Sequence, residues 1–168
     1  MKKLNILKTV VDFFWIVSCI PLIPLCLFFA IYMFFNDEVL KIFNVVDEGI
    51  IITLWSLKVL VLFVVALVLI SIYCFYLFRK TLRYYQQRKP FDNFVIETYQ
   101  KIGNLLVISG VIGSILNFSF HLIFKSSLTL NFGISPYAFV ICLGLFFMVL
   151  SETFKVAKSA KEENDLTV

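Results

Sequence analysis

The residues that could do chemistry in this chain are few and scattered. Its one histidine, His121, and its four cysteines, Cys19, Cys26, Cys74 and Cys142, all lie in apolar runs, and no two cysteines form a Cys-x-x-Cys pair. A zinc site or a disulfide framework needs several such residues at close spacing. No GxSxG, HExxH or phosphate-binding glycine loop occurs either. The sequence therefore predicts no metal, no cofactor and no enzymatic activity.

Polar groups inside the apolar runs are the next candidates, because they are expensive to hold in lipid. Lys58, Asn117 and His121 would frame a polar site for a small solute, beside a bend at Pro21 and Pro24. The alternative is that Lys58 and His121 are interfacial residues and that Asn117 hydrogen-bonds to a neighbouring helix. No carboxylate lies at the middle of a run, where a proton-coupled exporter needs one, and this counts against transport.

Two charged segments outside the apolar runs are candidates for binding a partner. One reads RKTLRYYQQRKPFDNFVIETYQKIG over residues 79–103, and the other is the ending AKEENDLTV. Charges would steer an encounter, and aromatic residues would supply most of the affinity. The alternative is that the arginines hold anionic lipid and that the tail is simply solvated. The candidate partner-binding residues are Arg79, Lys80, Arg83, Arg88, Pro90, Phe91, Asp92, Glu162, Glu163 and Asp165.

The composition indicates that membrane spans position these residues. Of the 168 residues, 61% are hydrophobic and only 15% are charged, and the mean hydropathy is +0.95. A soluble domain has about a quarter charged residues, so this chain has too few to cover a surface in water. The net charge of +4 does not indicate nucleic-acid binding, because the basic residues lie at the ends of apolar runs rather than in one patch.

Four apolar runs are long enough to cross a bilayer, which takes about 20 residues. They cover approximately residues 10–35, 51–78, 105–124 and 137–156. Each must be helical, because lipid offers the backbone no hydrogen-bond partner. The prediction is one all-α domain over residues 1–168, a polytopic membrane protein whose four transmembrane helices form a bundle.

Prolines and glycines predict local features of the first and third spans. Pro21 and Pro24 each remove a helical hydrogen bond, so we expect the first span to bend near mid-membrane. Gly103, Gly110 and Gly113 lie on nearly one face of the third span. Small residues on one face let another helix approach closely, so this face is the expected packing seam of the bundle.

Basic residues set the predicted orientation. They are concentrated at the N-terminal flank, between the second and third runs, and after the fourth run, whereas the other two connections carry few. Such an excess marks the cytoplasmic side, so both termini are predicted to be cytoplasmic. The first apolar run is too long for a cleavable signal peptide.

Two helices are expected to extend beyond the bilayer on that side. Asp92 follows Pro90 as a predicted N-cap, and apolar residues then recur at helical spacing. The third helix should therefore begin in the interface and continue into its span. The fourth should continue for a few turns and end in the acidic cluster.

These segments resemble a known family. KPFDNFVIETYQKIG is similar to the basic-Pro-Phe, helix, Ile-Gly block of a bacterial membrane family, and AKEENDLTV is similar to its closing Glu-Glu-x-Asp-Leu-Thr-Val signature. The family is domain of unknown function 2975, and the four apolar runs extend the resemblance over nearly the whole chain. Arg88 departs from the glycine expected before the basic-Pro-Phe step, so the turn there is not carried over.

The resemblance implies a four-helix protein of the bacterial inner membrane without assigned enzymatic activity. Members are often encoded beside a small helix-turn-helix regulator, which suggests such a regulator as a partner in addition to membrane lipid. The leading hypothesis is a non-enzymatic regulatory protein that sequesters the regulator and does not itself bind nucleic acid. The alternative is a small-solute transporter or membrane-stress protein with a site inside the bundle. Assembly into a homo-oligomer stays open.

Overall fold

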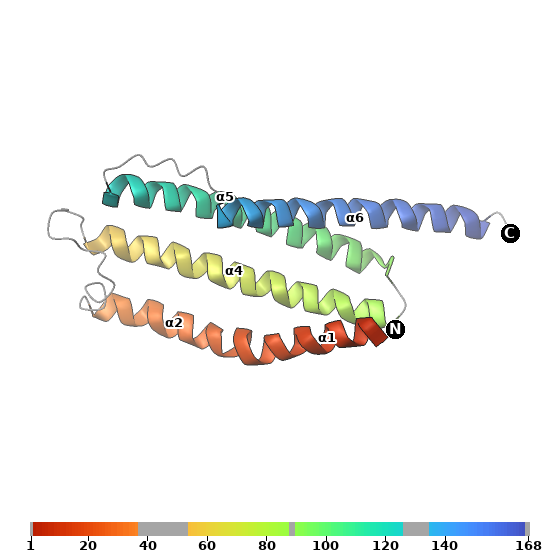
Figure 1. The fold of residues 1–168 in the computed structure, drawn as a ribbon, viewed down its shortest axis with the longest axis horizontal. Helices are drawn as coiled ribbons and strands as arrows, with labels where there is room; N and C mark the ends of the chain where they lie inside the picture. Colours follow the sequence, from red (N-terminus) through yellow and green to blue (C-terminus); the bar gives the residue numbers. More distant parts are fainter. Residues whose placement is uncertain (1, 37–53, 88–89, 126–134, 167–168) are drawn as a thin grey trace.

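The computed structural model describes residues 2–36, 54–87, 90–125 and 135–166, and the regular structure within these ranges is all helical. The first helix is continuous through α1 (Lys2–Phe14), a π-helix (Trp15–Cys19) and α2 (Ile20–Phe35). α4 (Leu54–Gln86), α5 (Asn93–Lys125) and α6 (Pro136–Leu166) follow. The predicted all-α bundle of four long helices is confirmed (Figure 1).

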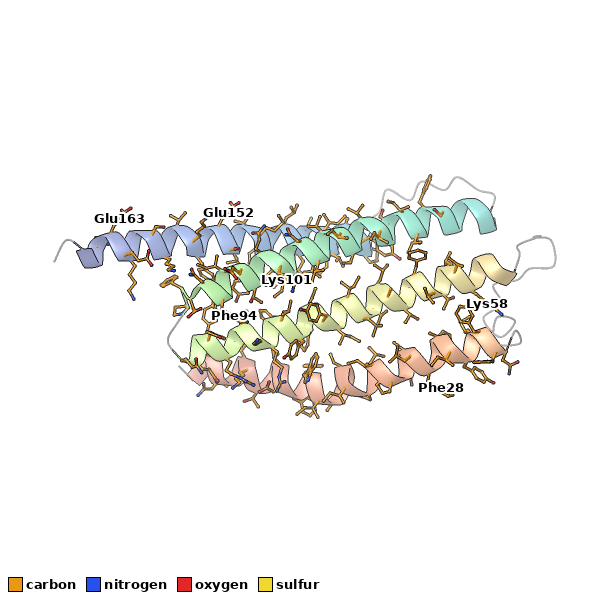
Figure 2. The ribbon with its side chains drawn as sticks, turned by 180° about the vertical axis from the view of Figure 1, so that it is seen from behind. Phe28, Lys58, Phe94, Lys101, Glu152 and Glu163 are labelled. Atoms are coloured by element: carbon orange, nitrogen blue, oxygen red, sulfur yellow. The ribbon has the colours of Figure 1, made fainter. Side chains whose placement is uncertain are left out.

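Each of the four helices contains a segment that is long and apolar enough to span a membrane. These segments are Leu4–Phe35, Lys58–Gln86, Asn93–Ser119 and Pro136–Asn164. Large apolar side chains such as Phe28 lie exposed on them, as lipid-facing residues do (Figure 2). The chain is therefore a multi-pass membrane protein. α5 begins well before the predicted third run, and α6 continues well past the fourth, as expected from the sequence.

The helices pack in the order α1–α2, α4, α5, α6 (Figure 1). α5 and α6 make the most extensive contact, α4 packs on α5, and the first helix packs on α4. Both chain termini lie at the same end of the molecule, which we call the terminal end (Figure 1). The buried core lies between the second half of α4 and the first half of α5, and it consists of Cys74, Leu77, Val95, Tyr99, Ile102 and Leu106. The terminal half of the bundle is thus the better packed half.

The first helix bends where α1 meets α2, as Figure 1 shows. Pro21 lies at the start of α2 and Pro24 within it. Pro21 has no N–H to bond the carbonyl of Val17, and its ring crowds that turn. A π turn directly before the proline accommodates the mismatch. The predicted bend is confirmed, with the distortion one turn ahead of the prolines.

The predicted glycine seam is confirmed, and α6 is its partner. Gly103, Gly110 and Gly113 are all buried, and α6 adds Gly144. A Cβ on Gly103 would lie 2.8 Å from the carbonyl oxygen of Gly144, so the two backbones are in contact there. Asn117 lies on an exposed face of α5 and has no hydrogen-bond partner among the described residues, so its expected bond to a neighbouring helix is not formed.

Candidate functional site

Arg79 joins α4 to the first helix instead of facing solvent. Its Nε donates to Oδ1 of Asp12, and its guanidinium lies over the Trp15 ring at 5.9 Å. The side chain is only 25% exposed. Asp12 and Trp15 lie on either side of the α1–π junction, so this contact anchors the bent helix to α4. Arg79 is thus occupied within the fold.

Lys80 and the residues around it join α4 to α5. The Lys80 ammonium lies 4.6 Å from the centroid of the Phe94 ring, and the same ring stacks on Tyr84 at 4.7 Å. A cation over an aromatic face is attracted by the ring quadrupole. Arg83, one helical turn along, is exposed. Arg79 and Lys80 therefore already contact a neighbouring helix, and Arg83 is the one of these three basic residues that is most accessible to a partner.

The turn before α5 is fixed by Asp92, which is the N-cap predicted from the sequence. Its Oδ1 accepts a hydrogen bond from the backbone N–H of Phe94 at 2.8 Å. Phe91 packs edge-on against Phe154 of α6 at 5.9 Å, and Phe154 also contacts Tyr99. Phe91 is therefore part of the bundle's packing. Pro90 is half-buried, and Arg88 lies outside the described residues.

The acidic end of α6 is helical and extends past the start of α5 (Figure 1). Glu162 pairs with Lys158 at 3.5 Å, and Nζ of Lys158 donates to Oδ1 of Asn93 at 2.6 Å. Glu163 points away from the rest of the bundle (Figure 2). Asp165 belongs to the helix, but its side chain lies outside the described part. We call residues 159–166 the α6 arm.

Seven of the ten predicted partner-binding residues can be assigned a position and a contact or exposure that bears on partner binding. Arg79, Lys80 and Phe91 contact neighbouring helices, and Asp92 caps the start of α5. Arg83, Glu162 and Glu163 are exposed, as is Lys80. On the arm, Glu162 pairs within its own helix, with Lys158. Partner binding stays a prediction. The acidic candidate residues that are exposed lie on the α6 arm.

The alternative site inside the bundle is not assembled by the described residues. Lys58 donates to the carbonyl oxygen of Phe34 at 3.4 Å, whereas Asn117 lies on the exposed face of α5. The side chain of His121 lies outside the described part. A cavity of about 230 Å³ between α4, α5 and α6 is lined mainly by apolar residues, with Ser71, Ser109 and Tyr137, and neither Lys58 nor Asn117 reaches it.

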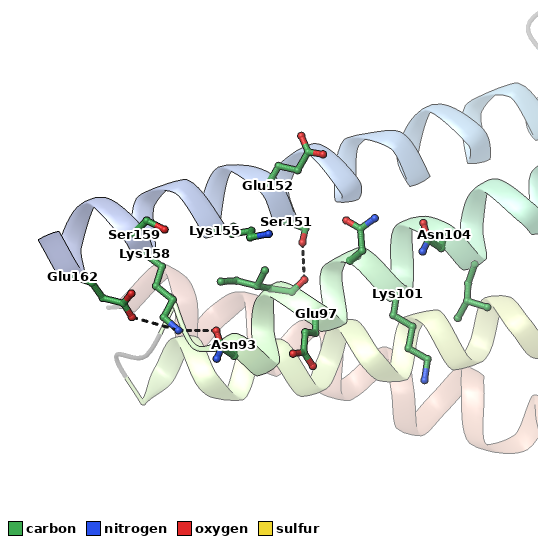
Figure 3. Close-up of a pocket in the computed structure, with 13 residues that line it drawn as sticks. Asn93, Glu97, Lys101, Asn104, Ser151, Glu152, Lys155, Lys158, Ser159 and Glu162 are labelled. Carbon is green, nitrogen blue, oxygen red and sulfur yellow. Dashed lines mark hydrogen bonds and ion pairs between the residues drawn. The ribbon is translucent and has the colours of Figure 1, made fainter.

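A polar groove between α5 and α6 is the feature that sequence reasoning missed (Figure 3). It measures about 820 Å³ and lies at the terminal end. Oγ of Ser151 donates to the carbonyl oxygen of Ile96 across its floor at 2.7 Å. The sequence held a signal for it, since two polar stripes have matching helical spacing. They are Asn93, Glu97, Gln100 and Asn104 on α5, and Ser151, Lys155, Lys158 and Glu162 on α6.

Metal binding finds no geometric support in the described ranges, where no group of three His, Cys, Asp or Glu residues gathers.

Comparison with protein families matches residues 7–168 to the family described as Protein of unknown function (DUF2975). The chain belongs to this family. The match covers nearly all of this DUF2975 protein, including its Pro-Phe block and its ending, and confirms the family resemblance. Comparison with curated proteins and comparison with solved structures each find no match.

Proposed function

We propose that this DUF2975 protein is a non-enzymatic regulatory protein of the bacterial cytoplasmic membrane, with both termini in the cytoplasm. Its α6 arm would hold a small helix-turn-helix regulator at the membrane. The observation that carries the proposal is the arm itself, which projects past the start of α5 as a helix (Figure 1). Residues 159–164 are all exposed, so a soluble protein can reach them without entering lipid.

The charge of the arm supports a basic partner. Glu162, Glu163 and Asp165 lie within one turn of α6. A DNA-binding regulator carries Lys and Arg where it contacts phosphates, and an acidic helix attracts the same surface. Binding at the arm would therefore compete with DNA as well as localise the regulator.

The cytoplasmic orientation of the arm is supported by the basic residues near it. Lys155, Lys158 and Lys161 lie at the terminal end of α6, and Arg79, Lys80 and Arg83 lie at the same end of α4. The family resemblance supplies the bacterial setting and the regulator encoded nearby.

Deletion of residues 162–168 tests the proposal, because it removes the acidic part of the arm and leaves the buried core of the bundle intact. The protein should still insert, but a co-expressed neighbouring regulator should move from the membrane fraction to the soluble fraction. Exchange of Glu162, Glu163 and Asp165 for lysine should have the same effect at full length. Exchange of Ser159 and Lys161 for alanine is the matched control and should leave the regulator membrane-bound. A regulator that is soluble beside the intact protein would contradict the proposal.

A further inference from the structure

The polar groove between α5 and α6 is bordered by exposed apolar surface. Apolar surface continues directly below it, where Ile108 of α5 is 53% exposed and Leu145 of α6 is 49% exposed. On the outer face of α6, Val156 is 70% exposed, so the apolar surface reaches the level of Lys155. From Asn104 to Asn93 the groove extends for about 16 Å along α5. It therefore begins at the hydrocarbon boundary and rises through the interface.

The groove presents polar side chains of both signs that have no interaction partner in the described structure. Glu97 and Asn104 on α5 and Lys155 on α6 form no hydrogen bond or ion pair with another described residue. Its other lysines are occupied, because Lys158 bonds to Asn93 and Lys101 turns to the hydroxyl of Tyr73. Gln100 and Glu152 also line the groove without a described partner, but Glu152 points away from it in Figure 3. Lys155, Glu97 and the amides of Gln100 and Asn104 thus remain for a ligand.

These groups lie along one stretch of the groove. The hydrogen bonds from Ser151 to Ile96 and from Lys158 to Asn93 fix how α6 is aligned against α5. Along α6, Lys155 lies between Ser151 and Lys158. Glu97 follows Ile96 on α5, so both residues line the same part of the groove. Figure 3 shows Lys155 between the two helices and Glu97 at the edge of α5 that is turned away from α6. A headgroup that meets both must therefore extend across the start of α5.

We propose that the groove binds a zwitterionic phospholipid with a primary ammonium, phosphatidylethanolamine. Its phosphate would accept a hydrogen bond from Lys155, and its ammonium would donate to Glu97. Its acyl chains would run down the apolar face past Leu105 and Ile108. One lipid molecule covers both the polar groove and the apolar surface beneath it, which a polar helix of a soluble partner cannot do. This inference does not depend on the α6 arm.

The charges of the groove select among headgroups. Phosphatidylcholine carries a quaternary ammonium with no N–H, so it cannot donate a hydrogen bond to Glu97. Phosphatidylglycerol carries a net negative charge, which Glu97 repels, and has no cation to balance it. The expected order of affinity is therefore phosphatidylethanolamine first, with the other two below it.

The test measures binding of the three lipids, with identical acyl chains, to the purified full-length protein by native mass spectrometry. Phosphatidylethanolamine should bind about tenfold more tightly than phosphatidylcholine, as expected for one charge-assisted hydrogen bond. Glu97→Gln should abolish this preference, and Lys155→Gln should weaken both lipids. Lys161→Gln, on the arm and outside the groove, is the matched control and should change neither. The melting temperature of each variant without lipid reports whether it folds.

Equal binding of phosphatidylethanolamine and phosphatidylcholine would overturn the proposal, as would a preference that survives in Glu97→Gln. Stronger binding of phosphatidylglycerol would also overturn it, because that result marks a simple anion site. Failure of all three lipids to bind would assign the groove to a protein partner instead and likewise overturn it.

Discussion

Replacing Gly103 with alanine should push α5 away from α6. The new Cβ would lie 2.8 Å from the carbonyl oxygen of Gly144 and 3.0 Å from the backbone nitrogen of Met148. A side-chain atom in the way can rotate aside, but these are backbone atoms of the facing helix. The two helices must therefore separate by several tenths of an ångström, and the packing around Gly103 loosens.

Two opposing effects set how much the free energy of unfolding falls in Gly103→Ala. Overpacking a tight interface costs about 1–3 kcal/mol, and backbone contact on α6 favours the upper end of that range. Alanine stabilises an exposed helix by about 1 kcal/mol relative to glycine. The free energy of unfolding should therefore fall by about 2 kcal/mol. Gly144→Ala should match it, because its Cβ would meet the carbonyl oxygen of Gly103 and the nitrogen of Val107, each at 2.9 Å.

Equilibrium unfolding by SDS in mixed micelles measures this loss. Gly113→Ala is the control on the same helix, because its Cβ would crowd ring atoms of Tyr137 at 2.6 and 2.7 Å, and that ring can turn, while Leu67 Cδ1 lies at 3.6 Å, an ordinary contact distance. Its free energy of unfolding should change by less than about 1 kcal/mol. If Gly103→Ala is as stable as the wild type, or more stable, the helices are not in backbone contact and the reasoning is refuted.

Three further predictions concern the terminal end. Asp92→Ala should destabilise α5 by about 1 kcal/mol and speed hydrogen exchange in its first turn, whereas Asp92→Asn should behave like the wild type. Arg79→Leu should lower the melting temperature more than the Arg79→Leu, Asp12→Leu double variant does, because the single change leaves the Asp12 carboxylate without its cation; equal melting would argue against the pairing. A reporter fused after Lys161 should be read in the cytoplasm, and one placed between α2 and α4 on the opposite side; the reverse readings would exclude the proposed orientation.

The sequence predicted those features that depend on one segment at a time. The four helices follow from uninterrupted apolar runs, the start of α5 from Asp92, and the seam from the spacing of Gly103 and Gly110 along one helix. Such features repeat with the helical period, so they need no knowledge of a neighbour.

The features that were missed depend on how two helices align. Asp12 and Arg79 are far apart in the sequence and meet only because the first helix packs on α4. The groove arises because the polar stripes of α5 and α6 have the same spacing and face one another. Each stripe by itself is indistinguishable from a solvated helix face, and the bonds from Ser151 to Ile96 and from Lys158 to Asn93 fix their alignment. Gly144 escaped notice for the same reason, since its role is visible only beside Gly103.

The packing of the terminal end links the two proposals. The buried core, the aromatic contacts of Phe94 and Phe154 and the pair of Arg79 with Asp12 all lie in that half of the bundle. Each contact joins neighbouring helices, so the start of α5 and the adjoining part of α6 are held at a fixed spacing. A groove whose two walls are fixed relative to each other can discriminate headgroups that differ only in their N–H groups, because its donors and acceptors do not rearrange to suit each lipid. The same rigid base fixes the direction in which the α6 arm projects. A lipid bound in the groove would brace α6 just below the arm, so phosphatidylethanolamine should strengthen retention of the regulator by the intact protein and have no such effect in the Glu97→Gln variant.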